Sequence, residues 1–191
     1  MKYFIDTEFL EDGHTIDLLS LGIVAEDGRD QYWQSVECAR SYANQWVREN
    51  VIPHLEPCEC LFEGLSVEEE KIPVLDVQHY GHCPWRTRTE IAKALREFID
   101  PERYGKPIFW GYCADYDWVA ICQLFGTMMD LPKDWPMYCR DLKQWADDLG
   151  NPRLPEEGKD EHHALADAQW NRKAWEFLNG IMENVKMPVG V

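Results

Sequence analysis

Four acidic residues and one histidine, spread from one end of the chain to the other, have the types and spacing that favour metal chemistry. Asp6 and Glu8 lie near the start, Asp117 lies in the middle, and His162 precedes Asp167 by five positions. Carboxylate oxygens are ligands that Mg²⁺ and Mn²⁺ prefer, and a histidine can take a proton from water at neutral pH. The set predicts a hydrolase that cleaves a phosphodiester with two divalent cations.

The first pair of acids follows a short apolar stretch, Met1–Ile5, which is typical of a strand entering a core. Residues two apart in a strand point to the same face, so Asp6 and Glu8 are expected side by side. Two ionised carboxylates there repel each other and lose hydration unless they are protonated, exposed or neutralised by a cation. The alternative is an edge strand that carries two solvated acids.

The middle acid follows a predicted buried strand, Lys106–Cys113, and precedes a helix expected from about Trp118 to Phe125. Functional residues favour the loops at strand ends of open α/β sheets. We expect Asp115 to cap the helix, which leaves Asp117 as the candidate metal ligand. Alternatively, both acids only complement the helix dipole.

The last motif combines His162 with Asp167 at the start of a helix predicted over His163–Leu178. Five residues correspond to a rotation of about 140° on a helix, so the two side chains cannot share one helical face. His162 is therefore expected on the preceding loop, with Asp167 one turn inside the helix. An ordinary ion pair between His163 and Asp167 is the competing interpretation.

The remaining elements must position these residues. Ile16–Ala25 and Asp30–Val36 read as strands that complete a three-stranded antiparallel meander with the first strand. Apolar residues at helical spacing, such as Ala43, Trp46 and Val47, predict further helices; these are Ser41–Asn50, Thr87–Ile99 and Arg140–Asp148. The order predicts an α/β fold, a mixed sheet flanked by helices.

Length and composition predict one domain over residues 1–191, since 45% of the residues are hydrophobic. The chain has no apolar stretch of about 18 residues, and its N-terminal residues do not resemble a secretory signal. We therefore expect a cytoplasmic protein without a membrane partner. The seven cysteines are expected to be reduced thiols rather than a disulfide framework.

The net charge of −16 argues against nucleic-acid binding through a broad basic face. An enzyme that holds two divalent cations needs fewer basic residues, because the cations bring positive charge to the phosphate. One basic cluster stands out, Arg86, Arg88, Lys93 and Arg96. A solvated helix face is the commoner explanation for such a cluster.

Three segments, FIDTEF, YDW and HHALADA, resemble in order and spacing the exonuclease motifs of the DEDD superfamily. The tyrosine branch would need Tyr at position 163, where this chain has His, so the chain resembles the DEDDh branch. FIDTEFLEDGHTI, GIVAEDGR and YDWVAICQLFG extend the resemblance to the RNase AS exoribonucleases over most of the chain. The departure is an insert at about 56–85, within which Cys58–Trp85 looks longer than its counterpart.

The resemblance implies an RNase H-like fold and magnesium-dependent 3'-5' hydrolysis of RNA to nucleoside 5'-monophosphates. It also implies a homodimer and a preference for adenylate-rich RNA 3' ends, such as poly(A). Two Mg²⁺ ions, replaceable by Mn²⁺, would be held by Asp6, Glu8, Asp117 and Asp167, and His162 would be the general base. The residues beside these acids would bind substrate, namely Thr7, Phe9 and Tyr116. Phe9 is alternatively a core aromatic residue.

Two other functions use the same residues differently. A DNA 3'-5' exonuclease of the proofreading or repair type would differ in how its groove treats the 2'-hydroxyl. An inactive nucleic-acid-binding module would usually have lost a catalytic acid, whereas all are present here. A zinc site in the insert is a minor hypothesis that we do not favour, because its C-x-C spacing is tight; its ligands would be Cys58, Cys60, His79, His82 and Cys83.

Overall fold

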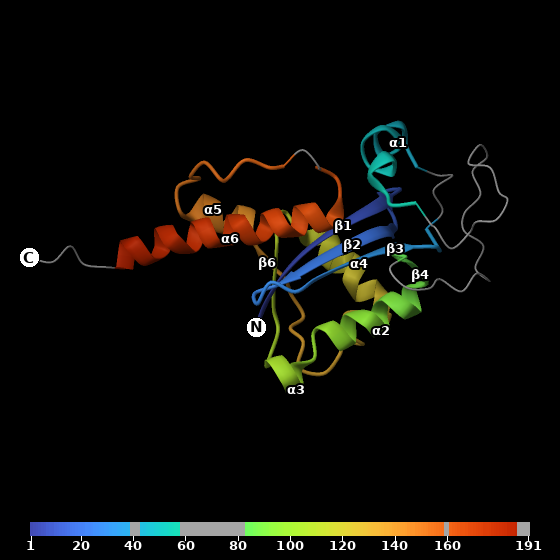
Figure 1. The fold of residues 1–191 in the computed structure, drawn as a ribbon, viewed down its shortest axis with the longest axis horizontal. Helices are drawn as coiled ribbons and strands as arrows, with labels where there is room; N and C mark the ends of the chain where they lie inside the picture. Colours follow the sequence, from blue (N-terminus) through green and yellow to red (C-terminus); the bar gives the residue numbers. More distant parts are fainter. Residues whose placement is uncertain (39–42, 58–82, 159–160, 187–191) are drawn as a thin grey trace, which may run out of the picture.

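The computed structural model describes residues 1–38, 43–57, 83–158 and 161–186 (Figure 1). Most of the predicted insert therefore lies outside the described residues. The same holds for all the proposed zinc ligands except Cys83.

A six-stranded mixed sheet forms the centre of the fold, in the order β4-β3-β2-β1-β5-β6. Its first three strands are the predicted antiparallel meander, and the three shorter strands pair in parallel with their neighbours. The strands are β1 (Lys2–Glu11), β2 (Ile16–Ala25), β3 (Asp30–Ser35), β4 (Trp85–Arg86), β5 (Ile108–Gly111) and β6 (Arg140–Asp141).

Helices cover both faces of this sheet (Figure 1). They are α1 (Gln45–Asn50), the 3-10 helix η2 (Ile52–His54), α2 (Arg88–Phe98), α3 (Pro101–Tyr104), α4 (Asp115–Phe125), α5 (Leu142–Asp148) and α6 (Ala164–Lys186). The predicted mixed α/β architecture is confirmed, and it is consistent with the RNase H-like fold.

The two faces of β1 bury different cores, because its side chains alternate. Tyr3 and Ile5 pack with α2 and α4, whereas Phe4 packs with Val24 and with Ala168 of α6. The faces are therefore a large core under α2 and α4 and a second core under α5 and α6. Asp6 and Glu8 continue the Phe4 row, so they point to the α6 face.

Several predicted boundaries need correction. Helix α4 begins at Asp115 rather than near Trp118, and α6 continues beyond Leu178 to Lys186. The helix predicted over Arg140–Asp148 begins at Leu142, because Arg140 and Asp141 pair with β5 as the short strand β6. Within the described residues, the helix predicted over Ser41–Asn50 spans Gln45–Asn50, after the cap residue Asn44.

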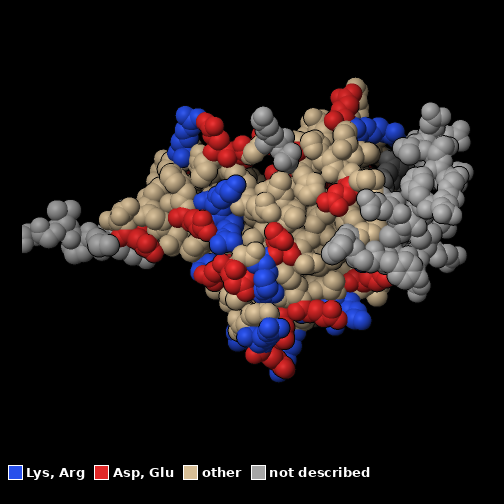
Figure 2. All heavy atoms as spheres, viewed as in Figure 1, with Lys and Arg blue, Asp and Glu red and all other residues tan. Residues whose placement is uncertain are grey.

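One face of the molecule shows how the charged side chains are distributed. On the face drawn in Figure 2, acidic and basic side chains are interspersed, and no broad basic area covers the atoms described there. In the predicted basic cluster, Arg88 forms an ion pair with Asp17, and the Arg96 guanidinium lies 5.0 Å from the centre of the Phe125 ring.

No described helix is both long enough and apolar enough to cross a membrane. Among the described cysteines, Cys113, Cys122 and Cys139 are free thiols.

Candidate active site

The predicted acids of β1 meet an acid of α6. Asp6, Glu8 and Asp167 each offer a carboxylate oxygen, and these oxygens lie within 4.8 Å of one another. All three residues are half-buried. Residues far apart in the sequence thus form one acidic cluster, with Asp6 and Glu8 on the same face of β1.

The fourth acid, Asp117, approaches the open edge of β1. Strand β5 pairs with β1 only from Lys2 to Phe4, so the next residues of β1 have no described strand on that side. The Thr7 N–H donates to Asp117 Oδ1 at 2.7 Å, and the Thr7 hydroxyl donates to the same oxygen at 2.6 Å. Asp117 is buried, and the Thr7 side chain is engaged with it. The predicted contact of Thr7 with substrate stays a prediction.

The predicted N-cap role of Asp115 is wrong. Asp115 is the first residue of α4, and Ala114 occupies the cap position without a side-chain bond to the helix. The side chain that bonds to the start of α4 is instead Asp141 of β6, whose Oδ2 accepts from the Ala114 N–H at 2.8 Å. The long-range pairing of β5 with β6 brings Asp141 to this place, and local sequence spacing does not reveal it.

His162 lies outside α6, as the spacing predicts, and Asp167 lies in the first turn of the helix. The His162 backbone is left-handed, with φ of 66°. Its N–H donates to Asp167 Oδ2 at 3.0 Å, which fixes the loop to the carboxylate. The His162 ring lies edge-on to Trp46 of α1, with 4.9 Å between ring centres.

The neighbouring His163 has different surroundings. Its ring stacks on Tyr32 of β3 with 4.4 Å between ring centres. Its Nδ1 accepts from the Ala166 N–H at 3.4 Å, and its Nε2 lies 4.0 Å from Glu56 Oε1. These contacts direct the His163 ring toward β3 and Glu56.

Burial is the main cause of raised pKa values at all four acids, and repulsion from the other site acids adds to it at Asp6 and Glu8. Burial raises the pKa of Asp6 well above its usual value, and repulsion from Asp117, Glu8 and Asp167 adds to this effect. Burial, with repulsion from Asp167 and Asp117, raises the pKa of Glu8 to about 8. Burial also raises the pKa of Asp117 and of Asp167 to about 6, against the lowering effect of their hydrogen bonds from Thr7 and His162.

This donor set fits divalent cations that prefer oxygen. Within the described part of the chain, no lysine or arginine forms an ion pair with any of the four acids. Neighbouring carboxylates that no lysine or arginine pairs with gain most from an added positive charge. Mg²⁺ and Mn²⁺ are the hard ions that such oxygen ligands suit.

Aromatic side chains flank the acids. Phe9 is half-buried and contacts the exposed Tyr116 edge-on at 5.7 Å between ring centres. The core clusters of the described residues do not include Phe9.

Trp46 was expected on the buried stripe of its helix but is 53% exposed, whereas Val47 packs in the core. Its contact with His162 depends on tertiary structure, which the helical spacing alone does not predict.

Three residues near the acids were missed by sequence reasoning. On β2, Ser20 lies opposite Glu8 and Gly22 lies opposite Asp6. From α6, the Asn171 side chain donates a hydrogen bond to the Ile5 carbonyl of β1. An isolated glycine inside a strand pattern is a known sign of close backbone approach, so Gly22 carried a signal that could have been used.

The sequence matches known proteins over most of its length. Residues 69–179 match the family model of the 3'-5' exoribonuclease Rv2179c-like domain. Two relatives from Mycobacterium tuberculosis are each 40% identical over 169 residues, which cover 88% of this chain and 88% of the relative. They are the 3'-5' exoribonuclease Rv2179c of strain H37Rv and the 3'-5' exoribonuclease MT2234.1 of strain CDC 1551. By both measures, this chain belongs to the Rv2179c-like family of 3'-5' exoribonucleases.

Proposed function

We propose that this protein is a metal-dependent 3'-5' exoribonuclease of the DEDDh type, which releases nucleoside 5'-monophosphates. The observation that carries the proposal is the meeting of Asp6, Glu8 and Asp167, with carboxylate oxygens within 4.8 Å of one another. The names of the two mycobacterial relatives support RNA as the substrate and the 3' end as the starting point.

Asp6, Glu8, Asp117 and Asp167 would hold two Mg²⁺ ions, with Mn²⁺ as a possible replacement. When bound, the ions supply positive charge to the scissile phosphate and lower the pKa of the attacking water. The protein keeps the ligands in place through short contacts. Thr7 fixes the orientation of Asp117 with two hydrogen bonds, and Asp167 is tied to the His162 backbone.

His162 would act as the general base that takes the proton from the attacking water. The proposal is supported by the loop before α6, where the His162 backbone is within hydrogen-bonding distance of Asp167 and the ring makes an edge-type contact with Trp46. The hydrogen bond from the His162 N–H to Asp167 couples the base to a metal ligand. Proton acceptance and metal binding would thus occur within one small site.

Phe9 and Tyr116 would contact the 3'-terminal nucleotide, since base stacking on aromatic rings is sequence-tolerant and favourable. Thr7 is proposed to contact substrate as well. A preference for adenylate-rich 3' ends follows from the resemblance to RNase AS. Competition between labelled oligoadenylate and oligouridylate tests this preference.

The central test uses 5'-labelled oligoadenylate RNA and the matching DNA, each with Mg²⁺ or with EDTA. We expect shortening of the RNA from its 3' end with Mg²⁺, release of AMP, and no reaction with EDTA or with Asp167→Asn. Binding without cleavage would indicate an inactive module. Faster hydrolysis of DNA would contradict the assignment to RNA.

The proposed homodimer and the proposed cytoplasmic location need separate measurements. Light scattering after size-exclusion chromatography should give twice the 22.4 kDa chain mass. A mass of one chain at micromolar concentration would contradict the dimer. Fractionation of the producing cells, followed by detection of the protein, tests its location.

A further inference from the structure

Gly22 of β2 lies against the first turn of α6. A Cβ atom at this position would lie 2.2 Å from the Ala164 carbonyl oxygen and 2.4 Å from the Leu165 nitrogen. These are backbone atoms, which cannot move aside as the end of a flexible side chain can. A side chain at position 22 would therefore push the start of α6 away from the sheet. Gly22 is also the cross-strand partner of Asp6.

Asn171 makes a second contact between α6 and the sheet. Its side chain is 1% exposed, and its Nδ2 donates to the Ile5 carbonyl oxygen at 2.9 Å. Ile5 is the residue directly before Asp6. The Asn171 Oδ1 is buried and has no hydrogen-bond partner among the described residues. A buried amide oxygen without a partner is unfavourable, so stability alone is a poor explanation for asparagine here.

These two contacts lie on either side of Asp167 along α6. Gly22 touches the helix at Ala164 and Leu165, and Asn171 is one turn beyond Asp167. Asp167 in turn accepts the hydrogen bond from the His162 backbone. A shift or tilt of α6 would therefore move the acid and the histidine together relative to Asp6 and Glu8.

We infer that Gly22 and Asn171 are positioning residues, which set the distance from Asp167 and His162 to the acids of β1. The inference rests on the proposed function, because it takes the acids as metal ligands and His162 as the base. Neither residue needs to touch substrate for this role. Both would act by fixing the position of α6 against β1 and β2.

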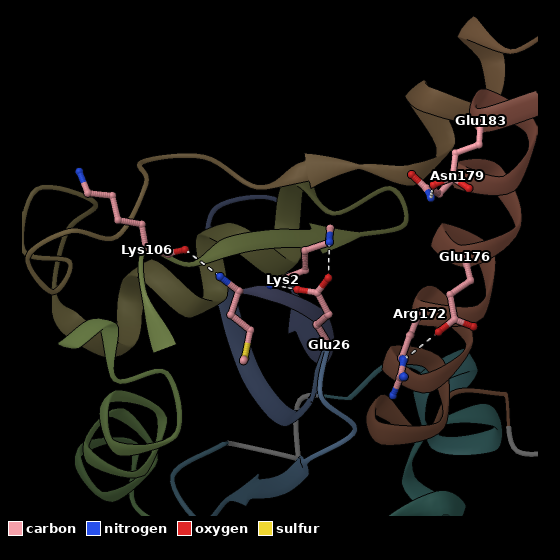
Figure 3. Close-up of polar contacts among 8 residues, drawn as sticks. Lys2, Glu26, Lys106, Arg172, Glu176, Asn179 and Glu183 are labelled. Atoms are coloured by element: carbon pink, nitrogen blue, oxygen red, sulfur yellow. Dashed lines mark hydrogen bonds and ion pairs between the residues drawn. The ribbon is translucent and has the colours of Figure 1, made fainter. Parts of the chain in front are cut away.

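The test compares Asn171→Leu with a matched change on the same helix. Leucine has a similar volume, removes the bond to Ile5 and also removes the unpaired oxygen. The control is Asn179→Leu, two turns further along, where Nδ2 donates to Glu183 at 2.9 Å on the surface (Figure 3). Mn²⁺ binding without RNA is measured by electron paramagnetic resonance, together with kcat, KM and the melting temperature.

For Asn171→Leu we expect Mn²⁺ affinity about tenfold weaker, as for other residues that orient metal ligands. The kcat should fall about 10- to 100-fold, since small misplacements of reacting groups have effects of this size. KM and the melting temperature should stay close to wild type, and Asn179→Leu should match wild type throughout. If leucine prevents folding, Asn171→Ala, which only removes atoms, takes its place. Gly22→Ala should weaken Mn²⁺ binding and lower the melting temperature together.

Wild-type Mn²⁺ affinity and kcat in the Asn171 variant would overturn the inference. An activity loss that follows only the loss of folded protein, at unchanged Mn²⁺ affinity, would also overturn it. Failure of the wild-type protein to bind Mn²⁺ and to hydrolyse RNA would instead overturn the proposed function. The two failures are therefore distinguishable.

Discussion

The two adjacent histidines before α6 differ in what their rings contact. His162 has a left-handed backbone, donates its N–H to Asp167, and presents its ring edge-on to Trp46. His163 stacks on Tyr32 and faces Glu56. Residue type alone does not distinguish the two histidines, whereas the bond to Asp167 supports the proposal that His162 is the base.

Replacement of His162 by alanine tests this choice. His162→Ala should lower kcat about 10²- to 10⁴-fold, as is typical when a general base is removed. Mn²⁺ affinity should stay within a few-fold, because the bond to Asp167 comes from the His162 backbone. Steady-state kinetics and metal titration measure both effects. His163→Ala is the matched control, and a larger loss of kcat in this control would reverse the assignment.

Thr7→Val removes one hydroxyl at nearly constant volume and leaves the backbone bond to Asp117. The lost bond lowers the pKa of Asp117 in the native protein, so its loss should raise that pKa and favour the protonated acid. The acid limb of kcat/KM should move to higher pH by about one unit. A pH profile measures the shift. A higher KM with an unmoved acid limb would indicate that Thr7 binds substrate instead.

The sequence allowed prediction of those site residues whose geometry is local. The two-residue period of a strand placed Asp6 beside Glu8, and the helical rotation placed His162 outside α6. Asp115 was misassigned as a cap because Asp141, 26 positions later, contacts the start of α4. Asn171 and Trp46 likewise reach the site through tertiary contacts, which neither periodicity nor residue spacing encodes. Gly22 differs, because an isolated glycine within a strand pattern is itself a sign of close backbone approach.

At the scale of elements, α1 is short, and its start depends on one side chain. The helix spans Gln45–Asn50, and Asn44 Oδ1 accepts from the Val47 N–H at 2.9 Å. Val47 packs with Leu10 and Leu19 at the end of the meander. A helix of this length has little stability of its own, so its cap and its core contact keep Trp46 beside His162.

Asn44→Ala should loosen α1 and thereby the contact with His162. Loss of an N-cap costs about 1 kcal/mol, which chemical denaturation detects. We expect kcat to fall by a few-fold while Mn²⁺ affinity is kept, because no proposed metal ligand lies on α1. Asn44→Asp retains a capping oxygen and should behave like wild type. Equal kcat in the alanine and aspartate variants would show that α1 does not support the base.

The elements themselves were predicted where apolar periodicity is strong. Strands β2 and β3 and helix α2 needed only small changes at their ends, since alternation and the 3.6-residue period are local signals. Strand β1, in contrast, continues from the predicted Met1–Ile5 stretch to Glu11. The short strands β4 and β6 were missed because two residues carry no period. Each is defined by pairing with a neighbour distant in the sequence, Gln34 for Trp85 and Trp110 for Arg140.

At the scale of the whole molecule, the net charge of −16 and the buried acids both lower the stability of the metal-free fold as pH rises. The native pKa values of Glu8, Asp117 and Asp167 are raised to about 8, 6 and 6. An acid with a raised native pKa binds more protons in the folded state than in the unfolded state. The metal-free protein should therefore lose stability as pH rises from the unfolded values near 4 through these native values.

Between pH 5 and pH 9, this loss should be on the order of 7 kcal/mol in the absence of metal. Mg²⁺ should offset most of it at pH 8.5, since a ligand that binds only the folded state stabilises that state. Thermal melting with EDTA and with Mg²⁺, across this pH range, measures both effects. High salt separates the two electrostatic sources, because it screens surface repulsion more than repulsion inside the site. Glu8→Gln should flatten the EDTA curve near pH 8. A metal-free protein that becomes more stable from pH 5 to pH 9 would contradict the raised native pKa values of these buried acids.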